Sequence, residues 1–299
     1  MAERLDMKKQ LNNMITRAID LHVHIGPEII PRKYTAQSLA DAERGKIAGC
    51  VLKNHFYPTA GMFDIKNIKG IQLFGSCVLN NSVGGMNAEA IYAASLVAPK
   101  PLIVWFPTLN SEQFLRRNKY EIAPEWVEDK SIRLKPASET IPVLVSKNSH
   151  LLPEVKRVIE MVALVKGVLA TGHIAANESF LVAKYARRLN IPVIVTHPIY
   201  QYINMPINMQ KDLAAMGCYI EQSYSMFSMD GVAIAKIANQ IKAVGPNSVV
   251  LSSDVGQSFS PSPSAALLLY CELLLKKGIG LSELEIMLVK NPRNILQIK

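Results

Sequence analysis

Two patterns of hydrophobic and polar residues alternate along the chain from about residue 18 to its C-terminus. One is a short, nearly continuous run of Val, Ile, Leu and Cys, which is typical of parallel strands buried on both faces. The other has apolar positions at helical spacing and polar residues between them. We expect helices in these amphipathic segments, for example at residues 36–46, 87–95, 177–189 and 230–243.

The apolar runs predict eight strands, and eight strands separated by helices are the composition of a (β/α)8 TIM barrel. A doubly wound open sheet is the competing α/β architecture, but no glycine-rich fingerprint follows the first strand. We therefore expect an α/β protein with the TIM-barrel fold. The predicted strands cover residues 18–24, 50–55, 72–79, 102–106, 167–173, 192–197, 217–222 and 248–254.

The chain has 299 residues, a length that one barrel domain can fill. We interpret residues 1–299 as a single domain. A domain of this size buries roughly three quarters of its unfolded surface, so it needs no metal ion for stability. Any ion that it binds would therefore serve catalysis.

The connection after the fourth predicted strand differs from the others. Residues 107–147 are polar and interrupted by prolines, with one apolar run at 141–145 that could form an extra strand. Long irregular segments in compact domains commonly act as lids or binding loops. Because this segment leaves the C-terminal end of a strand, we expect it to cover the mouth of the barrel; a peripheral insertion is the alternative.

The formal net charge is +9, but the basic residues occur singly or in pairs and form no run of five. This distribution is not that of a nucleic-acid-binding surface, and it is compatible with a small, anionic substrate. The longest apolar stretch, residues 265–275, contains Glu272 and is too short for a membrane span. We therefore expect no membrane partner. The slightly apolar composition is compatible with a homo-oligomer.

Four cysteines lie far apart in apolar surroundings, without the spacing of a zinc site or a disulfide framework. Buried thiols of this kind suit a reducing compartment. The first 17 residues carry charges throughout and lack the apolar core of a signal peptide. These features predict a cytoplasmic protein.

The most informative local motif is Asp20-Leu-His22-Val-His24, at the end of the first predicted strand. Alternation along a strand would send residues 20, 22 and 24 to one face, so that both imidazoles reach the barrel mouth. Two neighbouring histidines can bind a metal ion, and Asp20 could orient one of them.

The same placement recurs along the chain. Five of the six histidines follow a predicted strand, and the eighth strand ends in Asp254. A barrel brings all eight strand ends together, so these side chains are expected to converge. The five histidines are His22, His24, His55, His173 and His197.

This arrangement resembles the metal-dependent amidohydrolase superfamily. The resemblance is carried by His22 and His24 after strand one, His173 after strand five, His197 after strand six and Asp254 after strand eight. The closing segment Asn291-Pro-Arg-Asn-Ile-Leu also resembles the last helix common in that superfamily. It implies a metal-dependent TIM-barrel enzyme and leaves the substrate open.

Carried over residue by residue, the resemblance implies that His22, His24 and His173 bind a divalent ion. Asp254 would complete the set of ligands or accept the proton of the attacking water. His197 would be a ligand in a two-metal site and would bind or polarise the reacting group in a one-metal site. Zn²⁺ is the leading ion, although Mn, Fe and Ni also suit imidazole and carboxylate ligands.

Two-metal members usually carry a carbamylated lysine or a glutamate after strand four, and here that strand ends in Val104-Trp-Phe-Pro-Thr108. A one-metal site is therefore expected. Lys53 and His55 after strand two share a face. His55 could be an additional ligand or contact the substrate. Lys53 could bind an anionic substrate, bridge two ions, or act only as an electrostatic support.

Other polar residues fall on the same predicted rim. Arg32 and Lys33 could hold a carboxylate or phosphate of the substrate, and the Gly84-Gly85 pair could approach an anion or simply form a tight turn. In the seventh strand, either Glu221 or Gln222 faces inward, and the sequence does not decide between them.

The leading functional hypothesis is a metal-dependent hydrolase that cleaves an amide, lactone or related bond with a metal-activated water. In it, Asp254 acts as the base, while His197 and Lys53 stabilise charge on the attacked oxygen. The alternatives are other metal-dependent reactions on the same site, namely decarboxylation, deamination or phosphoester hydrolysis, and a non-catalytic metal-binding barrel.

Overall fold

The computed structural model describes residues 2–298. Within them, parallel strands form a three-stranded sheet in the order β1-β2-β3 and a six-stranded sheet in the order β11-β10-β9-β8-β5-β4. All eight predicted strands are present, the third of them divided at Gly75 into β3 and β4. The strands are β1 (Ile19–His24), β2 (Gly49–Lys53), β3 (Gln72–Phe74), β4 (Ser76–Val78), β5 (Ile103–Trp105), β8 (Val168–Ala170), β9 (Val193–Val195), β10 (Tyr219–Ser223) and β11 (Val249–Ser252).

The two sheets join into one barrel. The divided strand β3/β4 connects them on one side, because β3 pairs with β2 and β4 pairs with β5. On the other side, the Asp254 amide donates to the His22 carbonyl at 2.9 Å, and the His24 amide donates to the Val255 carbonyl at 2.8 Å. These bonds link the end of β1 to the residues that follow β11. The protein therefore has the predicted (β/α)8 fold.

Alternating side chains of the strands divide the core into two layers. The inner cluster includes Ile19, Val51, Phe74 and Trp105, and it is closed at the bottom of the barrel by Leu296 from the last helix. The outer cluster fills the space between the strands and the surrounding helices. The bottom of the barrel is thus packed with apolar side chains, which leaves the opposite end for polar chemistry.

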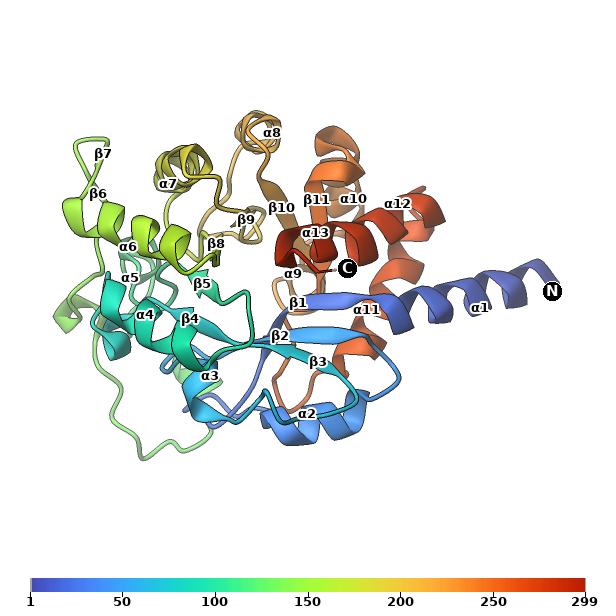
Figure 1. The fold of residues 1–299 in the computed structure, drawn as a ribbon, viewed down its shortest axis with the longest axis horizontal. Coiled ribbons are helices and arrows are strands. Elements are labelled where there is room, and N and C mark those ends of the chain that lie inside the picture. Colours follow the sequence, from blue (N-terminus) through green and yellow to red (C-terminus); the bar gives the residue numbers. More distant parts are fainter. Residues whose placement is uncertain (1, 299) are drawn as a thin grey trace.

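Helices lie around the outside of the strands, and α1 extends away from the body of the protein (Figure 1). Side chains fix where some of them begin: Thr35 accepts from the Ser38 amide at the start of α2, and Asn87 accepts from the Glu89 and Ala90 amides at the start of α4. The helices are α1 (Ala2–Arg17), α2 (Ala36–Glu43), α3 (Thr59–Met62), α4 (Ala88–Val97), α5 (Glu112–Leu115), α6 (Pro153–Leu164), α7 (Ala176–Arg188), α8 (Ile207–Ala215), α9 (Tyr224–Ser228), α10 (Ile234–Val244), α11 (Pro263–Leu275), α12 (Leu281–Glu285) and α13 (Asn291–Leu296), with a π-helical turn at Ile286–Lys290.

The segment after β5 is irregular apart from α5 and short 3₁₀ turns at Pro124–Trp126 and Ala137–Glu139. The extra strand expected at residues 141–145 is not formed. Only Val143 makes a bridge, to Ser111, and no described strand lies beside the rest of the run. Pro142 also lacks the N–H that a ladder would need. The chain instead forms a small antiparallel hairpin of β6 (Ser146–Lys147) and β7 (His150–Leu151).

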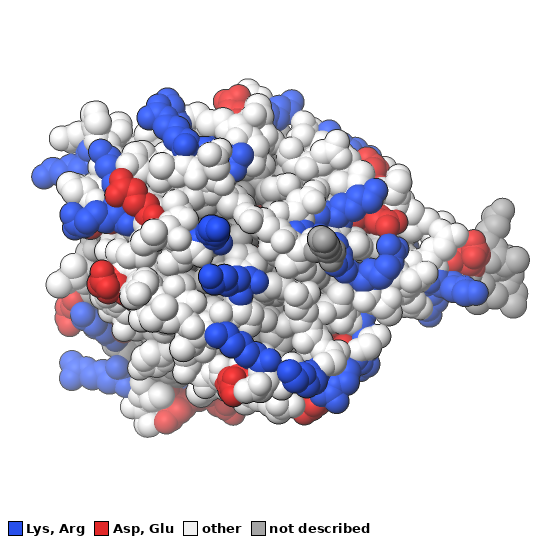
Figure 2. Space-filling model, viewed as in Figure 1, with Lys and Arg blue, Asp and Glu red and all other residues white. Residues whose placement is uncertain are grey.

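On the face shown in Figure 2, the described lysine and arginine side chains are dispersed among uncharged and acidic residues. None of the described helices has both the length and the apolar character needed to cross a membrane.

Candidate metal centre

A cavity of about 690 Å³ opens at the C-terminal ends of the strands. His24, His55, His173, His197 and Asp254 line it, together with Lys53. His22 lies directly beneath, fully buried, with its ring 5.3 Å from that of Trp105 in the inner core. The barrel therefore brings the predicted histidines, Asp254 and Lys53 to one end of the strands, whereas Lys33 and the Gly84-Gly85 pair do not line the cavity.

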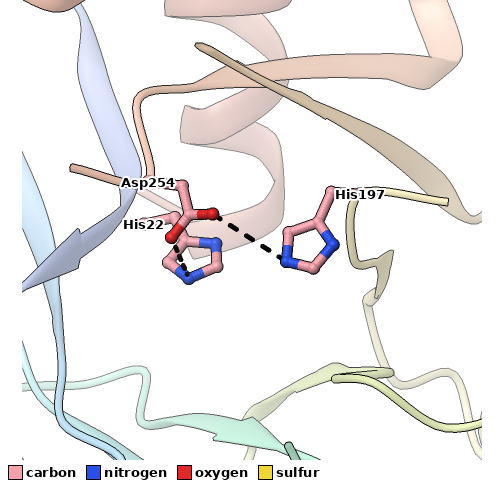
Figure 3. A group of neighbouring side chains, drawn as sticks. All are labelled: His22, His197 and Asp254. Carbon is pink, nitrogen blue, oxygen red and sulfur yellow. Dashed lines mark ion pairs between the residues drawn. The ribbon is translucent and has the colours of Figure 1, made fainter. Parts of the chain in front are cut away.

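Asp254 is the residue on which the histidines converge. Its Oδ1 lies 3.1 Å from His22 Nε2 and 3.1 Å from His24 Nε2, while its Oδ2 lies 3.9 Å from His197 Nε2. Figure 3 shows the carboxylate with its two oxygens directed toward the His22 and His197 rings. The Ser225 hydroxyl donates to Oδ2 at 2.7 Å and holds the carboxylate in this orientation.

The backbone around Asp254 is shaped to bring this carboxylate to the centre. Asp254 itself has a φ of +51°, a region that Asp and Asn enter more readily than most residues. Two residues later, Gly256 passes so close to β1 that a Cβ would lie 2.2 Å from the His24 carbonyl oxygen. Glycine is therefore required there for the chain after β11 to lie against β1.

The electrostatic balance keeps Asp254 ionised. Burial alone would raise the pKa of this carboxyl, but the adjacent His22 and the hydrogen bond from His24 hold it well below its usual value. Burial has the opposite effect on the imidazoles: it lowers the pKa of His197 to about 4 and those of His24, His55 and His173 well below the usual value. These four histidines are therefore neutral at pH 7, the form that binds metal ions.

Glu221 supports the site from the seventh strand. Its Oε1 lies 2.9 Å from His22 Nδ1 and accepts from the Ser252 hydroxyl at 2.6 Å, and its Oε2 accepts from the His197 amide at 3.2 Å. Gln222, the alternative that the sequence left open, points outward and bonds to Gln240 of α10. A carboxylate on the far nitrogen of a histidine fixes the tautomer that leaves Nε2 free as a ligand.

Asp20 does not have the orienting role that strand alternation suggested. The pairing register of β1 with β2 shifts between Asp20 and Val23, so residues 20 and 22 do not follow simple alternation. Asp20 Oδ1 instead accepts from the backbone amides of His22 and Ser253, at 3.1 and 3.0 Å. Burial raises the pKa of Asp20 to about 7. Its contacts are with the backbone, and Glu221 orients the His22 ring in its place.

Lys53 and His55 both reach the cavity, as their shared face predicted. Lys53 is buried, with Nζ 2.9 Å from His22 Nε2 and 5.2 Å from the centre of the Trp105 ring. Burial lowers the pKa of Lys53 to about 8. His55 Nδ1 lies 2.9 Å from the Thr108 hydroxyl, and its ring centre is 4.7 Å from that of His24.

The residues present fit a divalent ion. Atoms bound to one ion at about 2.1 Å in tetrahedral or octahedral geometry lie roughly 3.0–3.4 Å apart, which matches the two 3.1 Å separations at Asp254 Oδ1. Ligand atoms of His22, His197 and Asp254 all lie within 4.8 Å of one another. His24, His55 and His173 are not part of that group; the ring centre of His173 lies 5.1 Å from that of His197, and its Nδ1 has no described partner.

An ion can bind to His22 only if Lys53 moves away from it. The Nε2 of His22 has one lone pair, so it cannot accept a hydrogen bond from Lys53 and hold an ion at the same time. An ion on His22 would therefore require the Lys53 amine to leave its 2.9 Å contact.

Sequence reasoning did not identify three features of the site. Ser225 anchors Asp254, Ser252 anchors Glu221, and Tyr200 packs its ring 5.3 Å from those of both His173 and His197. Serines and tyrosines are common in loops, and the spacing of the two serines does not distinguish them. Tyr200 follows His197 by three residues, which was the one indication in the sequence that it could lie near the site.

Glu221→Gln is expected to weaken metal binding by roughly 10- to 100-fold while leaving the fold unchanged. The amide has the same shape, but it is uncharged and fixes the His22 tautomer less strongly. Titration of the metal-free protein with Zn²⁺ would measure the change, with Gln222→Glu as the matched control on the outer face. Unchanged affinity in Glu221→Gln would show that Glu221 does not support the ligand.

Comparison with known proteins places this geometry in a structural context. An amidohydrolase from Pseudomonas aeruginosa superimposes with a TM-score of 0.62 at 10% sequence identity, covering 97% of this chain and 98% of its own. The probable dipeptidase PvdM from the same organism gives 0.63 at 9% identity, covering 99% and 98%. The TatD homologue YJJV from Escherichia coli gives 0.56 at 13% identity, covering 95% and 100%. At these identities the likeness concerns the fold.

Sequence comparison gives the family. The search of curated proteins found no match. One family model, described as a family of unknown function (DUF6282), matches residues 17–221. That range contains six of the eight barrel strands, the first three residues of the seventh and all five histidines of the site, and it ends at Glu221. The chain therefore belongs to the DUF6282 family, whose function is unknown, and it has the fold of the amidohydrolases.

Proposed function

We propose that this protein is a metal-dependent hydrolase that cleaves an amide, lactone or related bond of a small molecule. The observation that carries the proposal is the convergence of His22 Nε2 and His24 Nε2 on one oxygen of Asp254, at ligand-to-ligand distances. The likeness of the fold to amidohydrolase structures supports it.

In the proposed site, His22, His24 and His173 hold the ion together with Asp254. His197 either completes this set or contacts the reacting group, and His55, whose ring centre is 4.7 Å from that of His24, has the same two possible roles. The donor set of neutral imidazoles and a carboxylate suits Zn²⁺ first and Mn, Fe or Ni as alternatives.

A divalent ion held there would lower the pKa of a coordinated water to about 7, so that hydroxide would be available at neutral pH. Asp254 accepts the proton from the attacking water and passes it to the leaving group. Its orientation for this task is fixed by Ser225 at 2.7 Å. His197 and the Lys53 amine, once released from His22, stabilise the negative charge that develops on the attacked oxygen.

The segment after β5 has a place in the same proposal. Trp126, Val127 and Lys130 line the cavity, as does Phe259 from the loop after β11. The Lys130 amine donates to the carbonyls of Pro124 and Val127, which ties this part of the segment together. We propose that it acts as a cover that excludes water from the reaction.

The test is metal analysis of the purified protein by plasma mass spectrometry, followed by a screen of amides and lactones with metal-loaded and chelator-treated protein. One ion per chain and metal-dependent hydrolysis are expected. Two ions per chain with phosphoester hydrolysis would make Lys53 and His55 ligands and favour the phosphoesterase alternative. No bound metal after reconstitution would contradict the proposal and leave a non-catalytic barrel.

A further inference from the structure

Arg32 lies in the loop between β1 and α2, where its backbone pairs with that of Gln257. Its side chain is only 2% exposed, yet it lines the cavity above the histidines. A guanidinium is seldom buried to this extent unless its hydrogen-bonding groups have partners. The partners of Arg32 therefore indicate what it is positioned to do.

One edge of the guanidinium is satisfied by the protein. Arg32 Nε donates to Glu28 Oε2, and Glu28 Oε1 accepts from the His55 amide at 2.7 Å. Beyond this bond from Nε, no hydrogen bond from Nη1 or Nη2 of Arg32 to a described residue is present. The Glu28 carboxylate thus fixes the side chain of a residue that lines the cavity, and it leaves Nη1 and Nη2 available to a ligand.

The neighbouring cations differ in this respect. The Lys33 amine donates to the Ser260 carbonyl at 2.6 Å, and the Lys130 amine donates to two carbonyls of its own segment. The Lys53 amine contacts His22. Among the described cations that line the cavity, Arg32 is the one that a buried carboxylate holds in place. Its pairing with Glu28 uses Nε and leaves other N–H donors of the guanidinium for a ligand.

We propose that Arg32 binds a carboxylate of the substrate, so that the hydrolase acts on a small molecule bearing a carboxyl group beside the bond that is cleaved. This inference rests on the proposed function for the reaction and on Arg32 alone for the substrate class. A planar fork of N–H donors matches the two oxygens of a carboxylate and would fix the orientation of the substrate as well as its position.

A carboxylate fits the charge balance of the cavity better than a phosphate does. Glu28 already offsets the charge of Arg32, and Glu125, Glu128 and Asp230 also line the cavity. Apart from Asp254 and the ion proposed to lie on it, a dianion would meet the carboxylates of Glu125, Glu128 and Asp230 against few unpaired cations. A monoanion needs only the directed hydrogen bonds that the free edge of Arg32 supplies.

The test measures ligand binding by isothermal titration calorimetry, with benzoate, benzamide and phenyl phosphate as probes. The proteins are the wild type, Arg32→Lys and the matched control Arg44→Lys, which makes the same change in a surface ion pair with Asp41 away from the cavity, each as purified and after chelator treatment. Arg32→Lys keeps a cation beside Glu28, so the buried carboxylate is not left unpaired. Circular dichroism melts verify that each variant is folded, and the double variant Glu28→Gln with Arg32→Gln replaces Arg32→Lys if it is not.

We expect benzoate to bind the wild type and to lose about tenfold or more in affinity in Arg32→Lys. Arg44→Lys should bind benzoate like the wild type, and benzamide should bind weakly to all the proteins. Equal benzoate affinity in wild type and Arg32→Lys would overturn the assignment, as would benzoate binding that is lost only on chelation. Tighter, Arg32-dependent binding of phenyl phosphate would overturn the choice of carboxylate.

The outcomes also separate this inference from the proposed function. Arg32-dependent benzoate binding by a protein that takes up no metal even after reconstitution would contradict the hydrolase and leave the carboxylate site in place. A metal-dependent hydrolase that binds benzoate equally well with and without Arg32 would confirm the proposed function and contradict the carboxylate site.

Discussion

Asp254→Asn is expected to slow turnover by roughly 10²- to 10⁴-fold while leaving the fold intact. The amide cannot accept the proton of the attacking water, and it removes the negative charge on which His22 and His24 converge. Asparagine suits the backbone at this position, because it tolerates the φ of +51° nearly as well as aspartate does. The loss would therefore be chemical rather than structural.

The measurement is kcat for the best substrate of the hydrolase screen, together with the metal content of the variant. Asp230→Asn is the matched control, because Asp230 is a carboxylate of the same cavity that contacts none of the histidines in a described ion pair. Full activity in Asp254→Asn would remove Asp254 from the role of the base. Lost activity with retained metal would place its contribution in proton transfer.

The double substitution of His22→Ala with His24→Ala is expected to abolish metal binding and to reduce activity to that of the uncatalysed reaction. These are two of the ligands nearest Asp254, and an ion held by the remaining groups would lack half of its expected ligands. Plasma mass spectrometry before and after reconstitution with Zn²⁺ measures the effect.

The matched control is His150→Ala, since His150 is the remaining histidine and lies exposed on the β6–β7 hairpin. It should retain wild-type metal content and activity. If the double variant kept one ion per chain, the metal site would have to be built from other residues, and the proposed function would lose its main support.

The barrel could be predicted because its strands have no polar face. A parallel strand covered by helices on one side and by the inner core on the other reads as a continuous apolar run, and all eight runs became strands. The site followed from the same logic, because residues at the ends of parallel strands meet at one end of a barrel. His22, His173 and Asp254 are separated by up to 232 positions, yet all of them reach the same site.

Strand alternation was reliable only where the pairing was regular. It failed at Asp20, because the register shift before Val23 breaks the period of two, and the sequence shows no sign of that shift. Alternation also could not decide whether Glu221 or Gln222 faces inward. A strand buried on both faces has no polar side that would show which residues point into the barrel. The run at 141–145 had strand composition but no partner strand.

The sequence by itself determined which segments form the barrel and which side chains reach its mouth, because both follow from local pattern and from the common direction of parallel strands. Only the tertiary structure decided how those side chains are paired. Glu221 on His22, Ser225 on Asp254 and Glu28 on Arg32 are contacts set by distances of a few ångströms between different loops and strands. Such distances depend on how the whole barrel closes, and no local pattern encodes them.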